Sequence, residues 1–124
     1  MNIFRASQVG DDWDAVRDEL ERAFVMSREA ARAEESFVFV VHSDDLLGRR
    51  GPGSAMVATG LLSAARTAAM EGSRKGWAAN VVAYDEDTDP DLVTEWAERL
   101  ATDPRGVTGE VIRLGASHIG KALP

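Results

Sequence analysis

The sequence predicts an α/β fold in which about three parallel strands lie between helices on both faces. Helical and strand patterns alternate along the chain in the order α-β-α-β-α-β, which favours a parallel sheet with right-handed crossovers. Residues 37–42 and 77–84 are apolar without alternation, which is typical of strands buried on both faces. A chain of 124 residues can form one core but hardly two, so we expect a single domain over residues 1–124.

The first helix is predicted over residues 13–33. Asp11 and Asp12 precede it and can cap its N-terminus, while Asp14 places negative charge in the first turn, where the helix dipole favours it. Apolar and small side chains recur there at steps of three and four, opposite a charged face, which predicts an amphipathic helix. The apolar stripe comprises Trp13, Val16, Leu20, Ala23, Phe24, Ser27 and Ala31.

A second helix is predicted over residues 54–74, after a turn region rich in glycine at residues 43–53. This helix has no charged side chain before Arg66, and small residues surround it almost completely. Because a surface helix would show a polar face, we expect this one to be covered on more than one side. Met56 and Met70 are interpreted as packing residues on it.

The last predicted elements are a helix over residues 91–102 and a short strand over residues 109–114. Asp89 and Pro90 have the residue types of an N-cap and a first helical position. The three tryptophans fall on apolar faces of predicted elements. We interpret them as core or interface anchors: Trp13, Trp77 and Trp96.

Acidic residues that follow the second strand have the spacing of a calcium loop, namely Asp85, Asp87 and Asp89. However, the position that requires glycine in such a loop is Pro90, and the position that requires glutamate is Trp96. We therefore interpret the segment as a solvated acidic loop that caps the following helix.

The histidines and the paired arginines do not predict a metal or anion site. His42 ends a buried strand and is interpreted as a structural histidine with its hydrogen bonds satisfied. His118 has no potential ligand near it in the sequence, so we expect no metal site. Arg49 and Arg50 could meet an anion or an acidic partner, but we favour the interpretation that they belong to a solvated loop.

The composition excludes several classes of function. The chain has no cysteine, which excludes a disulfide scaffold, a cysteine-based zinc site and a thiol nucleophile. Lys and Arg number 14 against 21 Asp and Glu, so the net charge is −7, and nucleic acid and anionic membranes are not expected partners. We see neither a signal-peptide pattern nor the ~20 apolar residues of a membrane span, so we expect a cytoplasmic protein.

Four segments resemble, in their order and spacing, the second half of a short-chain dehydrogenase/reductase. WDAVRDELERAF resembles the family's helix that opens with Trp-Asp, and FVFVVHS resembles the strand that ends in the catalytic serine. GPGSAMVATGLLSAARTAAMEGSRKGWAANVVAY is similar to the Tyr-x-x-x-Lys helix and the next strand, and VTGEVIRLGAS to the final Thr-Gly segment. The resemblance implies a partial Rossmann-like, three-layer fold.

The residues that carry the family's chemistry are replaced in this sequence. Ser43 matches the catalytic serine, but the tyrosine position is Met56 and the lysine position is Gly60. The position of the active-site asparagine falls on Leu20. In the family, the tyrosine is the general acid, and the lysine lowers its pKa and holds the ribose. Since Met56 has no proton to donate and Gly60 has no charge, the resemblance implies a catalytically inactive chain.

The family's cofactor site is also incomplete in this sequence. The Gly-rich turn that receives the pyrophosphate is absent before the first helix, and the glycines at residues 48–53 precede a different helix. The Pro-Gly pair that follows the family's sixth strand is replaced by Tyr84 and Asp85. We therefore expect that this chain alone binds no nicotinamide cofactor, and that NAD(P) binds only to a full-length partner.

The first hypothesis for function is a non-catalytic subunit that pairs with a full-length, active member of the family. A three-stranded sheet would have an open edge on its first strand, which a partner could cover. In the family, the helices that resemble residues 13–33 and 54–74 form the main subunit interface. The expected interface residues are Leu20, Phe24, Ser27, Ala31, Met56, Gly60, Ala64 and Ala68.

Two other hypotheses stay open. One is a self-associating homo-oligomer that acts as a scaffold or binds a small ligand. The other is an enzyme of another class that uses Ser43, His42 or Asp44 as new catalytic groups. The sequence names no substrate and no pathway for any of the three.

Overall fold

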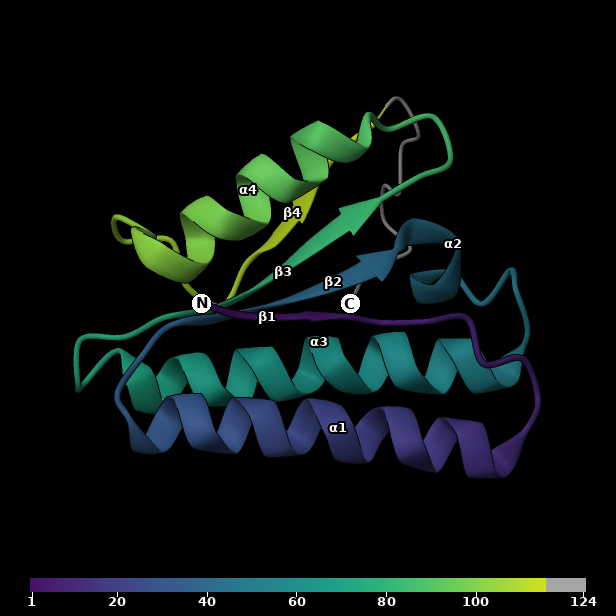
Figure 1. Cartoon of the computed structure of the whole chain (residues 1–124), viewed down its shortest axis with the longest axis horizontal. Helices are drawn as coiled ribbons and strands as arrows, with labels where there is room; N and C mark the ends of the chain where they lie inside the picture. Colours follow the sequence, from purple (N-terminus) through teal and green to yellow (C-terminus); the bar gives the residue numbers. More distant parts are fainter. Residues whose placement is uncertain (116–124) are drawn as a thin grey trace.

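A computed structural model of the chain, which describes residues 1–115, shows a four-stranded parallel sheet with helices on both faces (Figure 1). The strands lie side by side in the order β1-β2-β3-β4. Helices α1 and α3 lie below the sheet in Figure 1, and α4 lies above it. The elements are β1 (Asn2–Arg5), α1 (Trp13–Arg32), β2 (Phe37–His42), α2 (Ser43–Leu46), α3 (Pro52–Gly72), β3 (Ala79–Tyr84), α4 (Pro90–Thr102) and β4 (Val111–Arg113).

The α/β class and the helices on both faces are confirmed, but the sheet has one strand more than the sequence predicts. Strand β1 pairs in parallel with β2, with Asn2 opposite Phe37 and Arg5 opposite Val40. The edge of β2 that we expected to be open is therefore covered by the chain's own N-terminal residues. Phe4 packs edge-on against Phe39, with ring centroids 6.3 Å apart. A strand of four residues is too short to show a periodicity, which is why the sequence pattern missed it.

The third crossover connection has the opposite hand to the first two. From β1 to β4, each new strand is added at the same edge of the growing sheet. The connections through α1 and α3 cross one face of the sheet, whereas the connection through α4 crosses the other face (Figure 1). The prediction of right-handed crossovers is therefore wrong for the connection through α4. Helix α4 crosses on this face because the sheet is apolar there too, and Val40 and Val82 would be exposed to water without the helix.

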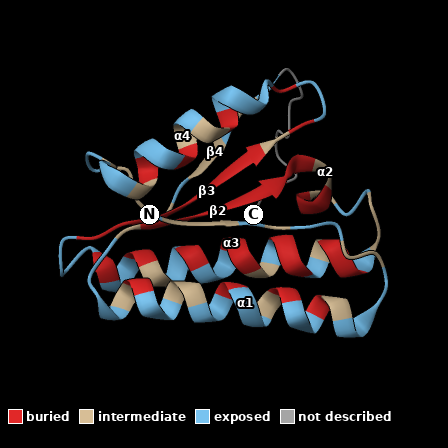
Figure 2. Cartoon of the chain, in the orientation of Figure 1, coloured by how far each residue is buried: buried red, intermediate tan, exposed pale blue. Residues whose placement is uncertain are grey.

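Two hydrophobic clusters hold the three layers together, one on each face of the sheet. Phe37, Phe39 and Val41 of β2 face α1 and α3, whereas Val38 and Val40 face α4. Figure 2 shows β2 and β3 buried along their length between the two layers of helices. The prediction that these strands are buried on both faces is thus confirmed.

Helix α1 buries a narrower stripe than the sequence predicts. Val16, Ala23 and Ala30 are buried, but Phe24 is 59% exposed and Trp13 is also exposed. One residue is about 100° around a helix, so the side chain that follows buried Ala23 points away from the core. Trp13 is therefore no core anchor in this chain, whereas Trp77 is buried.

Helix α3 is covered by the sheet on one side and by α1 on another, as expected, but its third side is exposed. Met56 is 53% exposed and Met70 is 75% exposed, so neither packs in the core of this chain. Small residues bring the helix close to its neighbours. A Cβ atom added to Gly60 would lie 3.7 Å from Leu20 Cδ2, and one added to Gly53 would lie only 1.8 Å from the carbonyl oxygen of Gly10.

A buried asparagine holds the last strand in place. Asn80 of β3 donates from Nδ2 to the carbonyl of Val107 at 2.8 Å, and its Oδ1 accepts from the backbone N–H of Glu110 at 3.1 Å. These bonds fix both ends of the turn that leads into β4.

None of the helices within residues 1–115 is long and apolar enough to cross a membrane.

The glycines of α3 give a matched pair of stability tests. Gly53→Ala should lower the free energy of unfolding by about 2–3 kcal/mol, because its methyl group would overlap the backbone of Gly10. Gly60→Ala should raise it by about 0.5–1 kcal/mol, because the methyl group has room and alanine favours the helix. Urea denaturation measures both. Equal effects of the two variants would contradict the close approach at Gly53.

Asn80→Ala should lower the free energy of unfolding by about 2–3 kcal/mol, since two buried backbone groups lose their partner. Asn2→Ala is the matched control, because its side chain bonds only to Glu35 and Ser36 near the surface. It should cost less than about 1 kcal/mol. A similar loss in both variants, measured by urea denaturation, would show that Asn80 does not hold β4.

Candidate functional site

A cavity of about 480 Å³ lies at the carboxyl ends of β1, β2 and β3, on the side of the sheet that α4 covers. Because the strands are parallel, their carboxyl ends meet at one edge, where open α/β sheets bind their ligands. Each of these strands contributes a polar side chain to the wall, and α4 contributes Val93 and Thr94. The polar residues from the strands are Arg5, His42 and Tyr84.

His42 is the most buried polar group of this wall, with 5% of its surface exposed. Its Nδ1 accepts a hydrogen bond from the backbone N–H of Asp44 at 3.0 Å, and this bond caps helix α2. The ring stands edge-on to Tyr84 at 5.2 Å between centroids. Because Nδ1 is an acceptor, the proton of the neutral ring is on Nε2. Nε2 has no hydrogen-bond partner within residues 1–115. The sequence predicted a histidine whose hydrogen bonds are satisfied, and this is observed for Nδ1 but not for Nε2.

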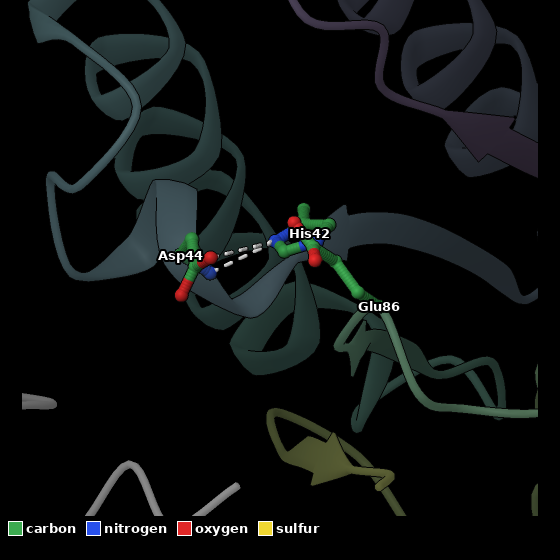
Figure 3. Close-up of side chains that lie close together, drawn as sticks. All are labelled: His42, Asp44 and Glu86. Atoms are coloured by element: carbon green, nitrogen blue, oxygen red, sulfur yellow. Dashed lines mark hydrogen bonds and ion pairs between the residues drawn. The ribbon is translucent and has the colours of Figure 1, made fainter.

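His42, Asp44 and Glu86 come together beside this cavity (Figure 3). One ligand atom of each residue lies within 4.8 Å of the others. The sequence reasoning did not group them, although a signal was present: His42 and Asp44 follow β2, Glu86 follows β3, and parallel neighbours end at the same edge. The arrangement is poorly suited to a cation, because Nδ1 of His42 already accepts a hydrogen bond and Asp44 pairs with Arg49 at 3.4 Å.

Arg50 is a fixed cation on the wall of the cavity, not part of a solvated loop as the sequence suggested. Its Nε and Nη2 donate to the two oxygens of buried Asp45 at 2.9 and 2.7 Å. The hydrogen bond to Asp45 raises the pKa of Arg50 above its ordinary value, although burial acts in the opposite direction. Only 25% of its side chain is exposed, whereas the neighbouring Arg49 is largely in solvent, as expected.

The loop after β3 is only partly the solvated acidic loop that the sequence predicts. Asp85 is buried: its Oδ1 accepts from the Thr88 hydroxyl at 2.9 Å and from the backbone N–H of Asp87 at 3.0 Å. Asp89 caps α4 as predicted, with its side chain accepting from the N–H of Asp91. The buried Asp85 and Thr88 shape the mouth of the cavity and turn the chain into α4.

The residues that the sequence resemblance places at the family's catalytic positions lie on α1, α2 and α3. Ser43 is buried at the start of α2, while Met56 is exposed on α3. Leu20 and Gly60 face each other where α1 meets α3. Tyr84 is the only tyrosine of the chain, and it lies on β3 beside His42. His118 and the last residues of the family-like final segment lie outside the described residues.

The expected interface residues lie along the side of α1 and α3 that faces away from the sheet, here called the outer α1–α3 face. Phe24, Met56 and Ala64 are exposed on it, and the others are partly buried: Leu20, Ser27, Ala31, Gly60 and Ala68. A groove of about 380 Å³ runs between the helices past Phe24 and Ala64. The Arg28 guanidinium lies 5.3 Å from the centre of the Phe24 ring.

No family model and no curated protein is significantly similar to this chain. Solved structures of short-chain dehydrogenases and reductases share its fold. One from Burkholderia xenovorans matches with a TM-score of 0.65 at 19% identity, over 90% of this chain and 61% of that chain. One from Mycobacterium smegmatis matches with a TM-score of 0.63 at 19% identity, over 95% of this chain and 60% of that one.

A third solved structure is described as 4-hydroxyisoleucine dehydrogenase complexed with NADH and succinate. It matches with a TM-score of 0.65 at 15% identity, over 91% of this chain and 67% of that chain. This chain therefore spans about three-fifths of the length of the first two structures and two-thirds of the third. The likeness confirms the partial Rossmann-like fold that the sequence resemblance implied.

The adjacent arginines allow a test of the fixed cation. Arg50→Gln should lower the free energy of unfolding by about 2 kcal/mol, because it leaves the buried Asp45 carboxylate without its partner. Arg49→Gln, which removes an exposed pair with Asp44, should change it by less than about 0.5 kcal/mol. Thermal and urea denaturation measure both, and equal losses would show that Asp45 does not depend on Arg50.

Proposed function

We propose that this chain is a catalytically inactive, short-chain dehydrogenase-like subunit that assembles with a full-length NAD(P)-dependent dehydrogenase or ketoreductase and stabilises or regulates it. The observation that carries the proposal is the replacement of both proton-transfer residues on a helix that keeps its place in the fold. Helix α3 holds Met56 and Gly60 where the family has its tyrosine and lysine. We place the complex in the cytoplasm.

The chemistry of the family's reaction supports an inactive chain. Reduction of a carbonyl requires a general acid at its oxygen and a cation that keeps this acid reactive. Methionine has no transferable proton and glycine has no charge, so α3 supplies neither. An enzyme of another class that uses Ser43 is disfavoured, because Ser43 is buried.

The outer α1–α3 face supports assembly with a partner. Helix α3 has only two charged residues, Arg66 and Glu71, and two methionines are largely exposed on it. Exposed apolar patches on a small domain mark interaction sites, and the exposed ring of Phe24 extends the patch onto α1. Two copies of each helix, one pair from each subunit, would form a four-helix bundle around a two-fold axis.

The alternative is self-association without a redox partner, as a scaffold or a binding protein. The few charges of α3 favour it, because a surface with little charge can meet its own copy across a two-fold axis with little repulsion. Co-expression decides between the two. The chain is produced together with a full-length, active short-chain dehydrogenase from its own organism, and the mass of the purified assembly is measured by light scattering. A mixed assembly supports the first proposal, a homodimer that excludes the dehydrogenase supports the alternative, and a monomer contradicts both.

Ala64→Arg should dissociate the assembly, because it places an unpaired charge in the proposed contact at a cost of about 2–5 kcal/mol. Ala64 is exposed in the single chain, so the fold itself should tolerate the change, which circular dichroism checks. Leu92→Arg is the matched control, since Leu92 is an exposed apolar residue of α4, on the other face of the sheet. If light scattering finds Ala64→Arg assembled like the wild type, the outer α1–α3 face is not the interface.

The isolated chain should bind none of the four nicotinamide cofactor forms. The reason is that α3 lacks the ribose-holding lysine and that Tyr84 and Asp85 replace the pair that lines the nicotinamide in the family. Calorimetric titration of the purified chain measures this, with the full-length dehydrogenase as the positive control. Saturable binding at micromolar concentration would contradict the proposal of an inactive subunit.

A further inference from the structure

His42 is a buried titratable group that the proposed function does not use. It ends β2, and its side chain is the N-cap of α2, the short helix over Ser43–Leu46. Its Nδ1 accepts a hydrogen bond from the backbone N–H of Asp44 at 3.0 Å. A ring nitrogen accepts a hydrogen bond only while it carries no proton, so this cap requires the neutral ring.

We propose that His42 is an acid-sensitive latch on α2. While the ring is neutral, it closes the N-terminus of the helix through the N–H of Asp44. When the ring takes up a proton, it exchanges this hydrogen bond for an ion pair with the Asp44 carboxylate, and the first turn of α2 opens. The latch needs neither a partner nor a ligand, and it is independent of the proposed function.

The first argument is a conflict between two donors in the protonated state. Both nitrogens of a protonated histidine carry a hydrogen. The hydrogen on Nδ1 would then face the N–H of Asp44, which lies 3.0 Å away, and the cap would be lost. The first four N–H groups of a helix lack a partner within it, and α2 has only four residues, so the helix depends strongly on its cap.

The second argument is that an acceptor for the protonated ring is already close. Oδ2 of Asp44 lies 4.0 Å from Nδ1 of His42. A charge-assisted hydrogen bond is about 2.7–2.9 Å long, so this carboxylate needs to move by only about 1 Å. Its present partner is the largely exposed Arg49, at 3.4 Å, and an exposed ion pair opposes such a movement only weakly.

Glu86 brings a second carboxylate to the same place (Figure 3). One of its oxygens, one oxygen of Asp44 and one ring nitrogen of His42 lie within 4.8 Å of one another. Two carboxylates at this distance stabilise the charged form of a histidine, although burial of the ring opposes it. Glu86 therefore helps His42 to take up a proton.

The other charged groups around His42 come from β1, from the loop after α2 and from the residues after β3. Helix α3 has no charged residue before Arg66, and α4 contributes only Val93 and Thr94 to the cavity beside the ring. Tyr84 lies edge-on to the ring. Four carboxylates stand against three guanidinium groups, so the balance favours a proton on His42. The acidic residues are Asp44, Asp45, Asp85 and Glu86, and the basic residues are Arg5, Arg49 and Arg50.

The experiment is an NMR titration of the ¹⁵N- and ¹³C-labelled chain from pH 8 to pH 5, the range in which histidines usually titrate, at constant ionic strength. His118→Gln is present throughout, so that His42 gives the only histidine signals. The amide of Asp44 should lose its hydrogen-bonded shift and its protection from exchange, with the same midpoint as the ring of His42. The amide of Asp91 is the internal control, because the carboxylate of Asp89 caps it and carboxyl groups titrate below this range.

Two acidic residues of one loop give a matched pair of variants. Glu86→Gln should lower the midpoint by about 0.5 pH units or more, because the charged ring loses a neighbouring carboxylate. Asp87→Asn should shift it by less than about 0.2 pH units, since Asp87 is exposed and does not belong to the cluster of His42, Asp44 and Glu86.

His42→Asn removes the titration but keeps an acceptor for the cap, because asparagine is a good N-cap residue. The amides of α2 in this variant should not change between pH 8 and pH 5. If the variant fails to fold, the wild type and the pair at positions 86 and 87 carry the test. The proposal is overturned if His42 does not titrate above pH 5, if it titrates while the amide of Asp44 stays unchanged, or if Glu86→Gln and Asp87→Asn shift the midpoint equally.

Discussion

The burial of β2 and β3 on both faces is the constraint on which the rest of this molecule depends. Strands without a polar face must be covered from two sides, and residues 1–115 provide three long helices to do it. Two of them, α1 and α3, cover one face. The third, α4, must then cross on the other face, and this requirement outweighs the usual hand of the crossover. The handedness of the last connection is thus a consequence of which side chains need cover.

The same layered arrangement separates two surfaces with different chemistry. The outer α1–α3 face combines exposed apolar side chains, such as Phe24 and Met56, with small residues and with charged side chains along its groove, among them Arg28 and Glu71. Polar residues lie at the carboxyl edge of the sheet, because the residues that follow parallel strands all lie at that edge.

Helix α3 shows how small side chains let a helix pack closely in this layered fold. The likeness to solved dehydrogenases lies in the backbone path, and the position of the helix beside α1 and the sheet is retained. A glycine at position 60 leaves room for Leu20 of α1, where a lysine would reach outward with its charge. The small side chain at position 60 therefore serves the packing of α3 against α1.

The sequence by itself determined the α/β class, the bounds of β2, the caps of α4 and the replacement of the catalytic residues, because each is a local pattern or a residue identity. It left open whether residues 1–9 supply an edge strand, because the four residues of β1 show no period and are held by pairing with β2 and by packing against the cores on both faces. Nor did it reveal that Phe24 and Met70 are exposed. Helical spacing tells in which direction a side chain points, but not how much of the helix surface the neighbouring sheet and helices cover. The order of the strands was enough to place His42 and Glu86 at one edge of the sheet, but the position of Arg50 beside them was decided by the tertiary structure, through its ion pair with buried Asp45.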